Sequence, residues 1–333
     1  MLDKDTYFKI KWLVAKNELI NNKKRGGFDY QKPKDDSIIE IHSRASGIQY
    51  GARAPQQTDM VEWLESIDLN LFETNQIDFN FDTKLLPDIG IRWSEYKAYP
   101  LSTTVHTALE FMNLHKDRRP VIFHNDFWYF QEIIDTKLQN ITEIKENDLL
   151  IISVPFFETF KYKDNIDGIL KRCCDLDIPV MLDLIWLPLS TETGQLRYTD
   201  CVQVIAQSMT KVLPLSGIKG GVCFWRQPVP KRFNMYPLGN NVGYSITKKY
   251  LEQFGYFHVR DSLKTLQNKW CKILNLSPHT MVMCGHIPNN HFLVNESLHS
   301  HRIPKSDLFN LLPFYENDHE ITRFLSDVDK LDN

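Results

Sequence analysis

The sequence predicts an α/β fold: a mixed, mostly parallel β-sheet sandwiched by helices, with a small α+β domain at the C-terminus. Short apolar segments of strand length alternate with helical patterns from Pro100 to Trp225, and this alternation is typical of a sheet covered by helices on both faces. This alternation of strand-length and helical segments ends after Arg226-Gln-Pro-Val-Pro230. A chain of 333 residues is long enough for one large domain and one smaller domain.

Residues 1–95 are expected to form a helical, arm-like segment. Residues 1–40 begin with an amphipathic helical pattern, which the run Asn21-Asn-Lys-Lys-Arg-Gly-Gly27 breaks. A second helix is predicted over residues 58–73, because apolar residues recur there at helical spacing.

Residues 96–235 form the predicted large domain. Its first helix begins at the run Ser102-Thr-Thr104, whose hydroxyl groups suit a helix start. The predicted elements are helix 102–112, strand 120–123, helix 126–138, strand 149–154, helix 165–176, and strands 180–184, 202–207 and 221–225.

Residues 236–333 form the predicted small domain. Its pattern indicates one long helix over residues 244–275, strands within 280–297 and a terminal helix over 316–331.

Charge and cysteine content exclude several classes of protein. The net charge is −3 and the pI about 6.4, so nothing indicates binding to nucleic acid or to an anionic membrane. The six cysteines contain no C-x-x-C pair, so we expect neither a disulfide framework nor a metal site. No apolar run is long enough to cross a membrane, and a cytoplasmic protein is therefore predicted.

The most informative stretch is Ser208-Met-Thr-Lys-Val-Leu-Pro-Leu-Ser-Gly-Ile-Lys-Gly-Gly221. In it, Lys211 directly follows an apolar strand pattern, and a turn leads to a second cation, Lys219. Upstream, Asp183 ends another apolar run. The sequence thus places a lysine, a cation and an acid at the ends of predicted strands.

These residue types meet the three needs of a site for pyridoxal phosphate. A lysine amine held at a strand end, here Lys211, can form a Schiff base with the aldehyde of the cofactor. Hydroxyl groups and a cation can hold the phosphate, and Ser208, Thr210 and Lys219 supply them. A buried carboxylate, Asp183, can keep the pyridine ring protonated. The alternatives are a solvent-facing lysine and an acid that caps a turn.

The stretch resembles the lysine motif of fold-type I pyridoxal-phosphate enzymes, the aminotransferase class I/II superfamily. In that family the pattern reads Ser-x-Ser/Thr-Lys and then Gly-x-Arg-x-Gly. Its places are held here by Ser208, Thr210, Lys211, Gly217, Lys219 and Gly221. The segment from Ile178 to Trp186 is similar to the family's strand that ends in Asp-x-x-Tyr, and residues 148–159 lie where the family has a strand and an Asn-Pro loop. The resemblance covers residues 95–235.

The resemblance implies further contacts to the cofactor. The family binds the phosphate at a helix start, which corresponds here to Ser102, Thr103 and Thr104, although plain N-capping is an alternative. An aromatic ring stacks on the pyridine in the family, and the candidates are Phe127 and Trp128. Ordinary packing of this aromatic run is the other interpretation.

Three positions depart from the family's pattern. Val154 stands before Pro155 where the family has an asparagine that contacts the ring oxygen, and Trp186 replaces the family's tyrosine beside the ring. Lys219 replaces an arginine and cannot make a bidentate contact to phosphate. Each change is expected to weaken or retune cofactor binding without abolishing attachment to Lys211.

The resemblance therefore implies a pyridoxal-phosphate-dependent enzyme, most simply an aminotransferase-like transferase, that acts on a small-molecule amine or amino acid. Once released from the cofactor, Lys211 would move protons at the α-carbon of the substrate. A homodimer is implied, because the family's site usually lies at a dimer interface. The alternative is a binding or regulatory protein that keeps the fold with reduced catalysis.

The usual clamp for a substrate carboxylate is missing from its expected place. In the family, a C-terminal arginine often forms a bidentate pair with that carboxylate, but residues 306–315 contain no arginine. Other candidates are Arg44, Arg53, Arg302 and Arg323. We therefore expect weak or no reaction with common amino acids.

Overall fold

The computed structural model describes residues 62–64, 66–67, 80–157, 159–192, 194–213, 220–228, 240–273, 276–286 and 308–310. The chain divides into two compact units, one over residues 56–261 and the other over 1–55 and 262–333. The domain limits expected from the sequence, 1–95, 96–235 and 236–333, remain predictions.

Several sequence expectations fall outside the described residues. They are the helix within residues 1–40, the helix over 316–331, Gly217, Lys219, and the four arginines considered as carboxylate clamps. Of the helix expected over 58–73, residues 62–64 and 66–67 are described; residues 62–64 and 66 are helical, and residue 67 is in a bend.

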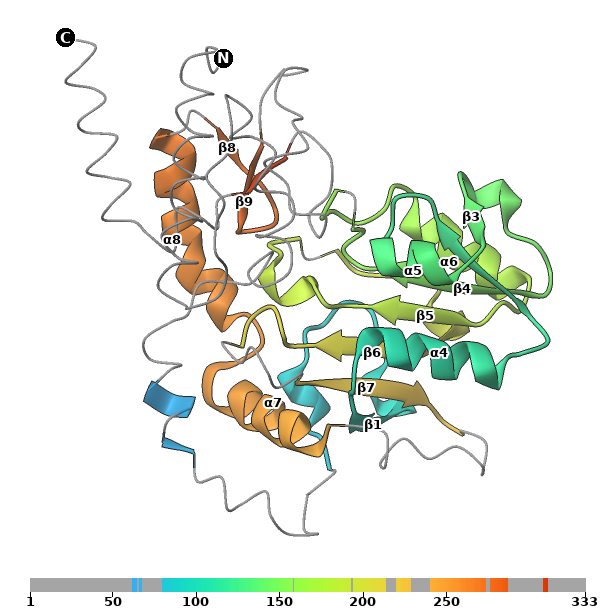
Figure 1. The fold of residues 1–333 in the computed structure, drawn as a ribbon, viewed down its shortest axis with the longest axis horizontal. Coiled ribbons are helices and arrows are strands. Elements are labelled where there is room, and N and C mark those ends of the chain that lie inside the picture. The colour runs from blue at the N-terminus through green and yellow to red at the C-terminus, as the bar shows by residue number, and fades with distance from the viewer. Residues whose placement is uncertain are drawn as a thin grey trace, which may run out of the picture. The chain divides into compact units, whose positions relative to one another are not determined.

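A seven-stranded sheet forms the centre of the larger unit (Figure 1). Its strands are β1 (Tyr96–Pro100), β2 (Arg119–Phe123), β3 (Thr136–Leu138), β4 (Asp148–Ser153), β5 (Val180–Asp183), β6 (Val202–Ser208) and β7 (Gly221–Arg226). Their order is β1-β7-β6-β5-β4-β2-β3. Strand β7 runs antiparallel to β1 and β6, and all other neighbouring pairs are parallel. The predicted α/β class with a mixed, mostly parallel sheet is confirmed.

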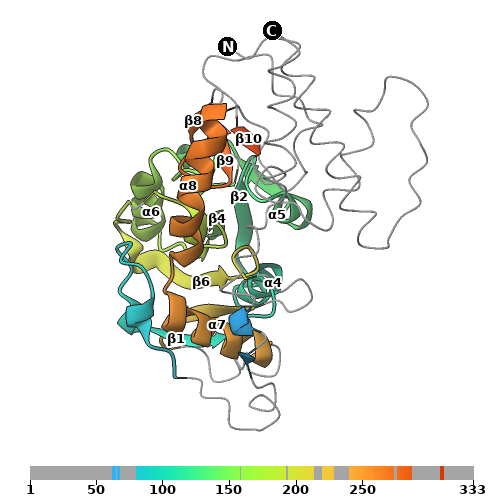
Figure 2. The ribbon, with the colours of Figure 1, turned by 90° about the vertical axis from the view of Figure 1, so that its left-hand side faces the viewer.

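Helices cover both faces of this sheet. The described α-helices of the larger unit include α4 (Thr104–Leu114), α5 (Trp128–Ile133), α6 (Ile166–Asp175) and α7 (Asn241–Phe254). Helix α8 (His258–Ile273) begins at the end of this unit and continues into the second unit. Short 3-10 helices are η3 (Thr83–Leu85), η4 (Trp93–Glu95), η5 (Ile141–Glu143), η6 (Leu187–Leu189) and η7 (Thr199–Cys201). Figure 2 shows α4 and α5 on one face of the sheet and α6 on the other. This arrangement explains why β4 and β5 are buried along their whole length.

The face under α4 and α5 carries one continuous apolar core. Alternate residues of the strands point to this face, among them Ile151 of β4, Met181 of β5 and Ala206 of β6. Helix α4 packs Ala108 and Phe111 onto them. The core therefore fixes how the start of α4 lies over the ends of the neighbouring strands.

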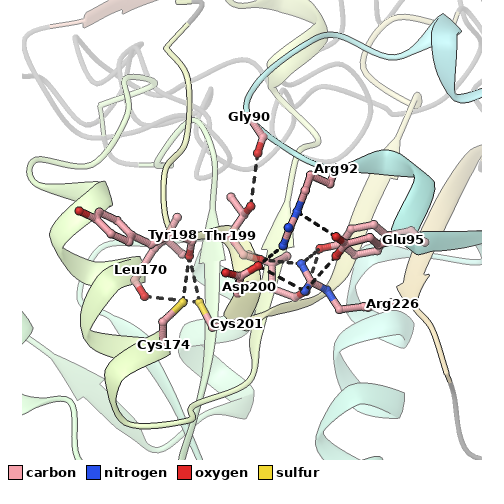
Figure 3. A network of polar contacts seen from close by, with 12 residues as sticks. Gly90, Arg92, Glu95, Leu170, Cys174, Tyr198, Thr199, Asp200, Cys201 and Arg226 are labelled. Atoms are coloured by element: carbon pink, nitrogen blue, oxygen red, sulfur yellow. Dashed lines mark hydrogen bonds and ion pairs between the residues drawn. The ribbon is translucent and has the colours of Figure 1, made fainter.

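The polar network in Figure 3 joins the opposite, amino-terminal ends of the parallel strands. Arg226, at the end of β7, forms an ion pair with Glu95 (Nη1 to Oε2, 3.1 Å) and donates to the Thr199 carbonyl oxygen at 2.8 Å. Arg92 pairs with Glu95 at 2.9 Å and also with Asp200. These contacts link β1, β7 and the turn before β6 at the edge remote from the Lys211 motif.

Three element predictions differ from the structure. The helix expected over 126–138 is α5 alone, because residues 136–138 pair with β2 as edge strand β3. The helix expected over 244–275 is divided into α7 and α8 by Gly255, whose φ of 81° suits glycine and cannot continue a helix. Strand β1 was not anticipated, since Tyr-Lys-Ala-Tyr-Pro lacks strict alternation and is fixed by pairing with β7.

In the second unit, the described residues include a small antiparallel sheet. Its strands are β8 (Ser277–Pro278), β9 (Cys284–His286) and β10 (Leu308–Asn310), in the order β10-β9-β8. Gln267 of α8 is buried, and its amide donates to the carbonyl oxygens of His279, Met281 and Cys284 at 2.8, 3.1 and 2.8 Å. One side chain thus orders the turn between β8 and β9.

Candidate cofactor site

The candidate site lies at the carboxyl ends of the parallel strands, where ligands of open α/β sheets commonly bind. Asp183 is the last residue of β5, and Ser208 is the last residue of β6. Both lie two residues after core positions of the α4 face, so their side chains belong to that face. The sequence motifs, distant along the chain, therefore meet at one edge.

Asp183 is a buried acid with one unsatisfied oxygen. Its side chain is only 1% exposed, and Oδ1 accepts the Ile185 N–H at 3.1 Å. Among the described residues, no hydrogen-bond partner of good geometry reaches Oδ2. A buried carboxylate oxygen without a donor is unfavourable, so this position suits an N–H group of a ligand.

Burial is the main cause that raises the pKa of Asp183 from 3.8 to about 7. The neighbouring Asp126 carboxylate also raises this pKa, whereas the Ile185 N–H, the Lys211 ammonium and the Thr104 hydroxyl lower it. Lys211 and Thr104, at the start of α4, therefore lie near Asp183.

The turn after β6 holds Lys211 close to the strand end. Met209 N–H donates to the Gly220 carbonyl oxygen at 3.0 Å, which brings the chain back to β7. Ser208 and Thr210 hydroxyls are 3.0 Å apart, and the Thr210 N–H donates to Ser208 Oγ at 3.4 Å. The three residues of the predicted Ser-x-Thr-Lys motif thus form one compact turn.

Gly221 is required where β7 begins. A Cβ at this position would lie 2.5 Å from the Gln207 carbonyl oxygen and 3.0 Å from the Ser208 Cα, both backbone atoms. A side chain here would push β7 away from the end of β6.

Lys211 faces an aromatic cluster. Its Nζ lies 4.8 Å from the centre of the Trp186 ring, a distance that permits a cation–π contact. Trp186 also contacts Phe160 and Phe157, with ring centres 4.9 and 6.5 Å apart, and Phe157 lies 5.6 Å from Phe127. The predicted site residues Trp186 and Phe127 therefore belong to one continuous group of rings.

The start of α4 faces the same edge. Thr103 is the N-cap, and its Oγ1 accepts the His106 N–H at 2.9 Å. Thr104 is buried beside Asp183, and Ser102 is half-buried just before the cap. Thr103 serves as the N-cap that the alternative interpretation expected, and the first N–H groups of this 11-residue helix can also face an anion.

Two predicted residues are only partly accounted for. Trp128 begins α5, but its side chain lies outside the described residues, as does all of Lys219. Val154, where the family has asparagine, is buried at the end of β4. Its apolar side chain can offer no hydrogen bond to a ring oxygen.

Sequence analysis missed Asp126, Ser153 and Phe157, which also lie around this edge. Asp126 follows β2, and Ser153 ends β4 in register with Asp183. Asp126 is 2% exposed and accepts the N–H groups of Phe127 and Ser153. The signal was present, since a polar residue at the end of each apolar strand marks this edge.

The described residues contain no group of three or more histidine, cysteine, aspartate or glutamate side chains placed to hold a metal ion. No helix among them is both long and apolar enough to cross a membrane.

Comparisons with known proteins agree on the fold. No protein-family profile and no curated protein sequence matches the chain. A double mutant of aspartate aminotransferase from Thermus thermophilus matches with a TM-score of 0.54 and 13% identity, over 90% of this chain and 99% of that one. OvoB matches with a TM-score of 0.52 and 13% identity, over 90% and 98% of the two chains.

A third structure is the PLP-bound C-S lyase from Staphylococcus hominis, with a TM-score of 0.52 and 12% identity over 78% and 83% of the two chains. The chain thus has the fold of fold-type I pyridoxal-phosphate enzymes, although only 12–13% of its residues are identical to those of these three structures.

Proposed function

We propose that the chain is a pyridoxal-phosphate-dependent enzyme that acts on an amino-group-bearing substrate, in the manner of an aminotransferase. The observation that carries the proposal is the Asp183 carboxyl. It is buried at a strand end, it has an oxygen without a partner among the described residues, and it lies near a lysine that follows the next strand. A buried carboxyl group with an unsatisfied oxygen lowers the stability of the fold, so its presence favours a role in binding a ligand.

The residues at this edge fit each part of the cofactor. Asp183 would hold the ring nitrogen through Oδ2, and the Lys211 amine would bond to the aldehyde carbon. The phosphate would take its contacts from Ser208, Thr210, Lys219 and the start of α4. When bound, pyridoxal phosphate supplies an electron sink for the bonds at the α-carbon of an amine.

Different residues of the chain would transfer the proton and cover the pyridine ring. The Lys211 amine would serve as the base that takes and returns a proton at the α-carbon of the substrate. Trp186 limits where the Lys211 amine can move, because its ring lies 4.8 Å from Nζ. Phe127 is half-buried and presents the ring that would cover the pyridine, while Phe157 and Phe130 fix it from the side.

The substrate class and assembly follow the same proposal. Two of the structural matches are aminotransferases, of aspartate and of histidinol phosphate, and this supports a small amine or amino acid as substrate. A homodimer remains part of the proposal, because sites of this fold usually lie between two subunits.

Cofactor binding can be tested directly. The purified protein should gain a visible absorbance when pyridoxal phosphate is added, and borohydride reduction followed by peptide mapping should place the cofactor on Lys211. Lys211→Ala should lose the label. Lys163→Ala is the matched control and should keep it, because Lys163 is another half-buried lysine near the same strand ends. Labelling elsewhere, or no labelling at saturating cofactor, would overturn the proposal.

A second candidate function is a cofactor-binding protein with reduced turnover. Two observations favour it: Val154 is apolar where a ring-oxygen contact is expected, and Trp186 offers no phenol hydroxyl beside the ring. Stable binding of the cofactor on Lys211, together with no turnover across a panel of amines and amino acids, would favour this function over catalysis.

A further inference from the structure

Asp126 is a buried acid that ties together two parts of the candidate site. One carboxylate oxygen accepts the Phe127 N–H at 2.7 Å, and the other accepts the Ser153 N–H at 2.9 Å. Phe127 carries the ring proposed to cover the cofactor, and Ser153 is the last residue of β4. Asp126 thus connects the loop after β2 to the end of the neighbouring strand.

That strand end lies directly beside Asp183. Ser153 and Asp183 are partners in the parallel pairing of β4 with β5, so their side chains project side by side from the same face. The Asp126 carboxylate reaches this face through its bond to the Ser153 amide. Two buried acids therefore approach each other where the ring nitrogen of the cofactor would lie.

We propose that Asp126 is a positioning residue of this site, which holds Phe127 and the end of β4 in place, and that its carboxylate charge acts on the neighbouring Asp183 carboxyl, which keeps its proton until the ring nitrogen of the cofactor arrives. The inference rests on the proposed function, and it names a residue and a role that extend it.

Two lysines and two hydroxyl groups act on the pair, and all four favour the charged carboxylates. Lys163 acts on Asp126 but lies over the rings of Phe156 and Phe123, at 4.0 and 5.0 Å from their centres. Lys211 acts on Asp183. The hydroxyls of Ser153 and Thr104 face Asp126 and Asp183, respectively.

Burial outweighs these groups for both acids. It raises the pKa of Asp126, although the Ser153 and Phe127 contacts and Lys163 lower it. It likewise raises the pKa of Asp183 to about 7, to which the Asp126 charge adds. Near neutral pH the pair therefore holds a proton that can be given up.

The proton balance of cofactor binding follows. The O–H bond of a protonated Asp183 breaks, an N–H bond forms at the ring nitrogen, and the electron pair of the O–H bond stays on the carboxylate. A buried ion pair replaces two neutral groups, and no proton has to enter from solvent. Asp126 contributes negative charge that favours the protonated ring.

The inference can be tested on the cofactor-free protein by carbon-13 NMR of labelled aspartate carboxyl groups across the range from about pH 5 to pH 9. Asp126→Asn should lower the titration midpoint of Asp183 by about one pH unit, because sites that interact this strongly titrate together. In the wild-type protein the Asp126 carboxyl resonance should also move as Asp183 ionises, because each group senses the charge of the other, and Asp183→Asn should remove this step.

Asp148→Asn is the matched control. Asp148 is 1% exposed, and it accepts hydrogen bonds from Arg119 and Lys145 at the other end of β4. Its replacement should leave both midpoints unchanged. If Asp126→Asn fails to fold, the Asp183→Asn protein still decides the question, because the step at the Asp183 midpoint should be absent from its Asp126 titration curve.

An Asp183 midpoint that moves by less than about 0.3 pH unit in folded Asp126→Asn, or an Asp126 titration curve that is the same with and without the Asp183 carboxyl, would overturn the inference. A purely structural Asp126 would give that result even if its loss destabilised the protein. The measurement needs no cofactor, so coupled titrations in a protein that fails to bind pyridoxal phosphate would refute the proposed function and not the pairing of the two acids.

Discussion

Replacing Asp183 with asparagine should make the cofactor-free protein increasingly stable, relative to wild type, as the pH rises. The pKa of this carboxyl is about 7 in the folded protein and 3.8 as its ordinary value, and burial is the main cause of the difference. The folded state therefore binds this proton more tightly than the unfolded state does. The stability that this proton contributes is present below about pH 4 and is lost as the pH rises through about 7.

The size of this loss follows from the two pKa values. At about 1.4 kcal/mol for each pH unit, the difference between 3.8 and about 7 corresponds to about 4 kcal/mol of unfolding free energy. About 3 kcal/mol of this falls between about pH 5 and pH 8. An asparagine has no charge to bury, so the variant does not undergo this loss. Any fixed cost of placing its amide there adds equally at every pH and cancels from the comparison.

Urea unfolding of the two cofactor-free proteins, followed by tryptophan fluorescence at several pH values, measures the effect. The control is Asp148→Asn, in which the lost carboxylate is paired with Arg119 (Oδ1 to Nε, 2.7 Å), so this variant should lose stability. If the difference between Asp183→Asn and wild type changes by less than about 1 kcal/mol over this range, the carboxyl is not held as its burial indicates.

Three further outcomes are expected. Lys219→Ala should weaken the affinity for pyridoxal phosphate by at least about tenfold in a fluorescence titration, because a hydrogen bond to a charged group is worth about 1.5–3 kcal/mol. Lys171→Ala, at an exposed lysine, is the control. Equal affinities of Lys219→Ala and wild type would place Lys219 outside the site. Glutamate, aspartate and alanine should leave the absorbance of the bound cofactor nearly unchanged, and rapid, saturable conversion by glutamate would show that a carboxylate clamp exists. Arg226→Met should lower the unfolding free energy by about 1–3 kcal/mol, because the contacts to Glu95 and Thr199 are lost. The affinity for the cofactor should stay the same, and a loss of affinity would contradict the separation of this network from the site.

The central sheet could be predicted from the sequence because its strands are buried on both faces. Strands β4 and β5 appear as continuous apolar runs, which few other elements of this length show. The edge strands β1 and β3 could not be recognised in this way. They are short and mixed in composition, and pairing with β7 and β2 decides their conformation. Gly255 was a visible break, but the helical periodicity on either side concealed it.

The candidate site was predictable only where a motif preserved the order of its residues. Ser208, Thr210 and Lys211 are consecutive in one turn, and the structure keeps them together. Asp126 belongs to no such motif. Its role depends on the pairing of β4 with β5 and on the N–H groups of Phe127 and Ser153, which are not apparent from spacing along the chain.

The free-energy cost of burying Asp183 bears on whether these strand ends hold a cofactor or only maintain the fold. A scaffold under selection for stability alone would replace a buried acid that costs about 4 kcal/mol, since a neutral residue of similar size removes that cost. Val154 and Trp186 are buried around the same edge, so this edge accommodates apolar side chains. Asp183 is nevertheless an acid, although it is the more unfavourable group. A ligand that supplies an N–H donor to Oδ2 removes this conflict, and pyridoxal phosphate, attached through Lys211, would do so.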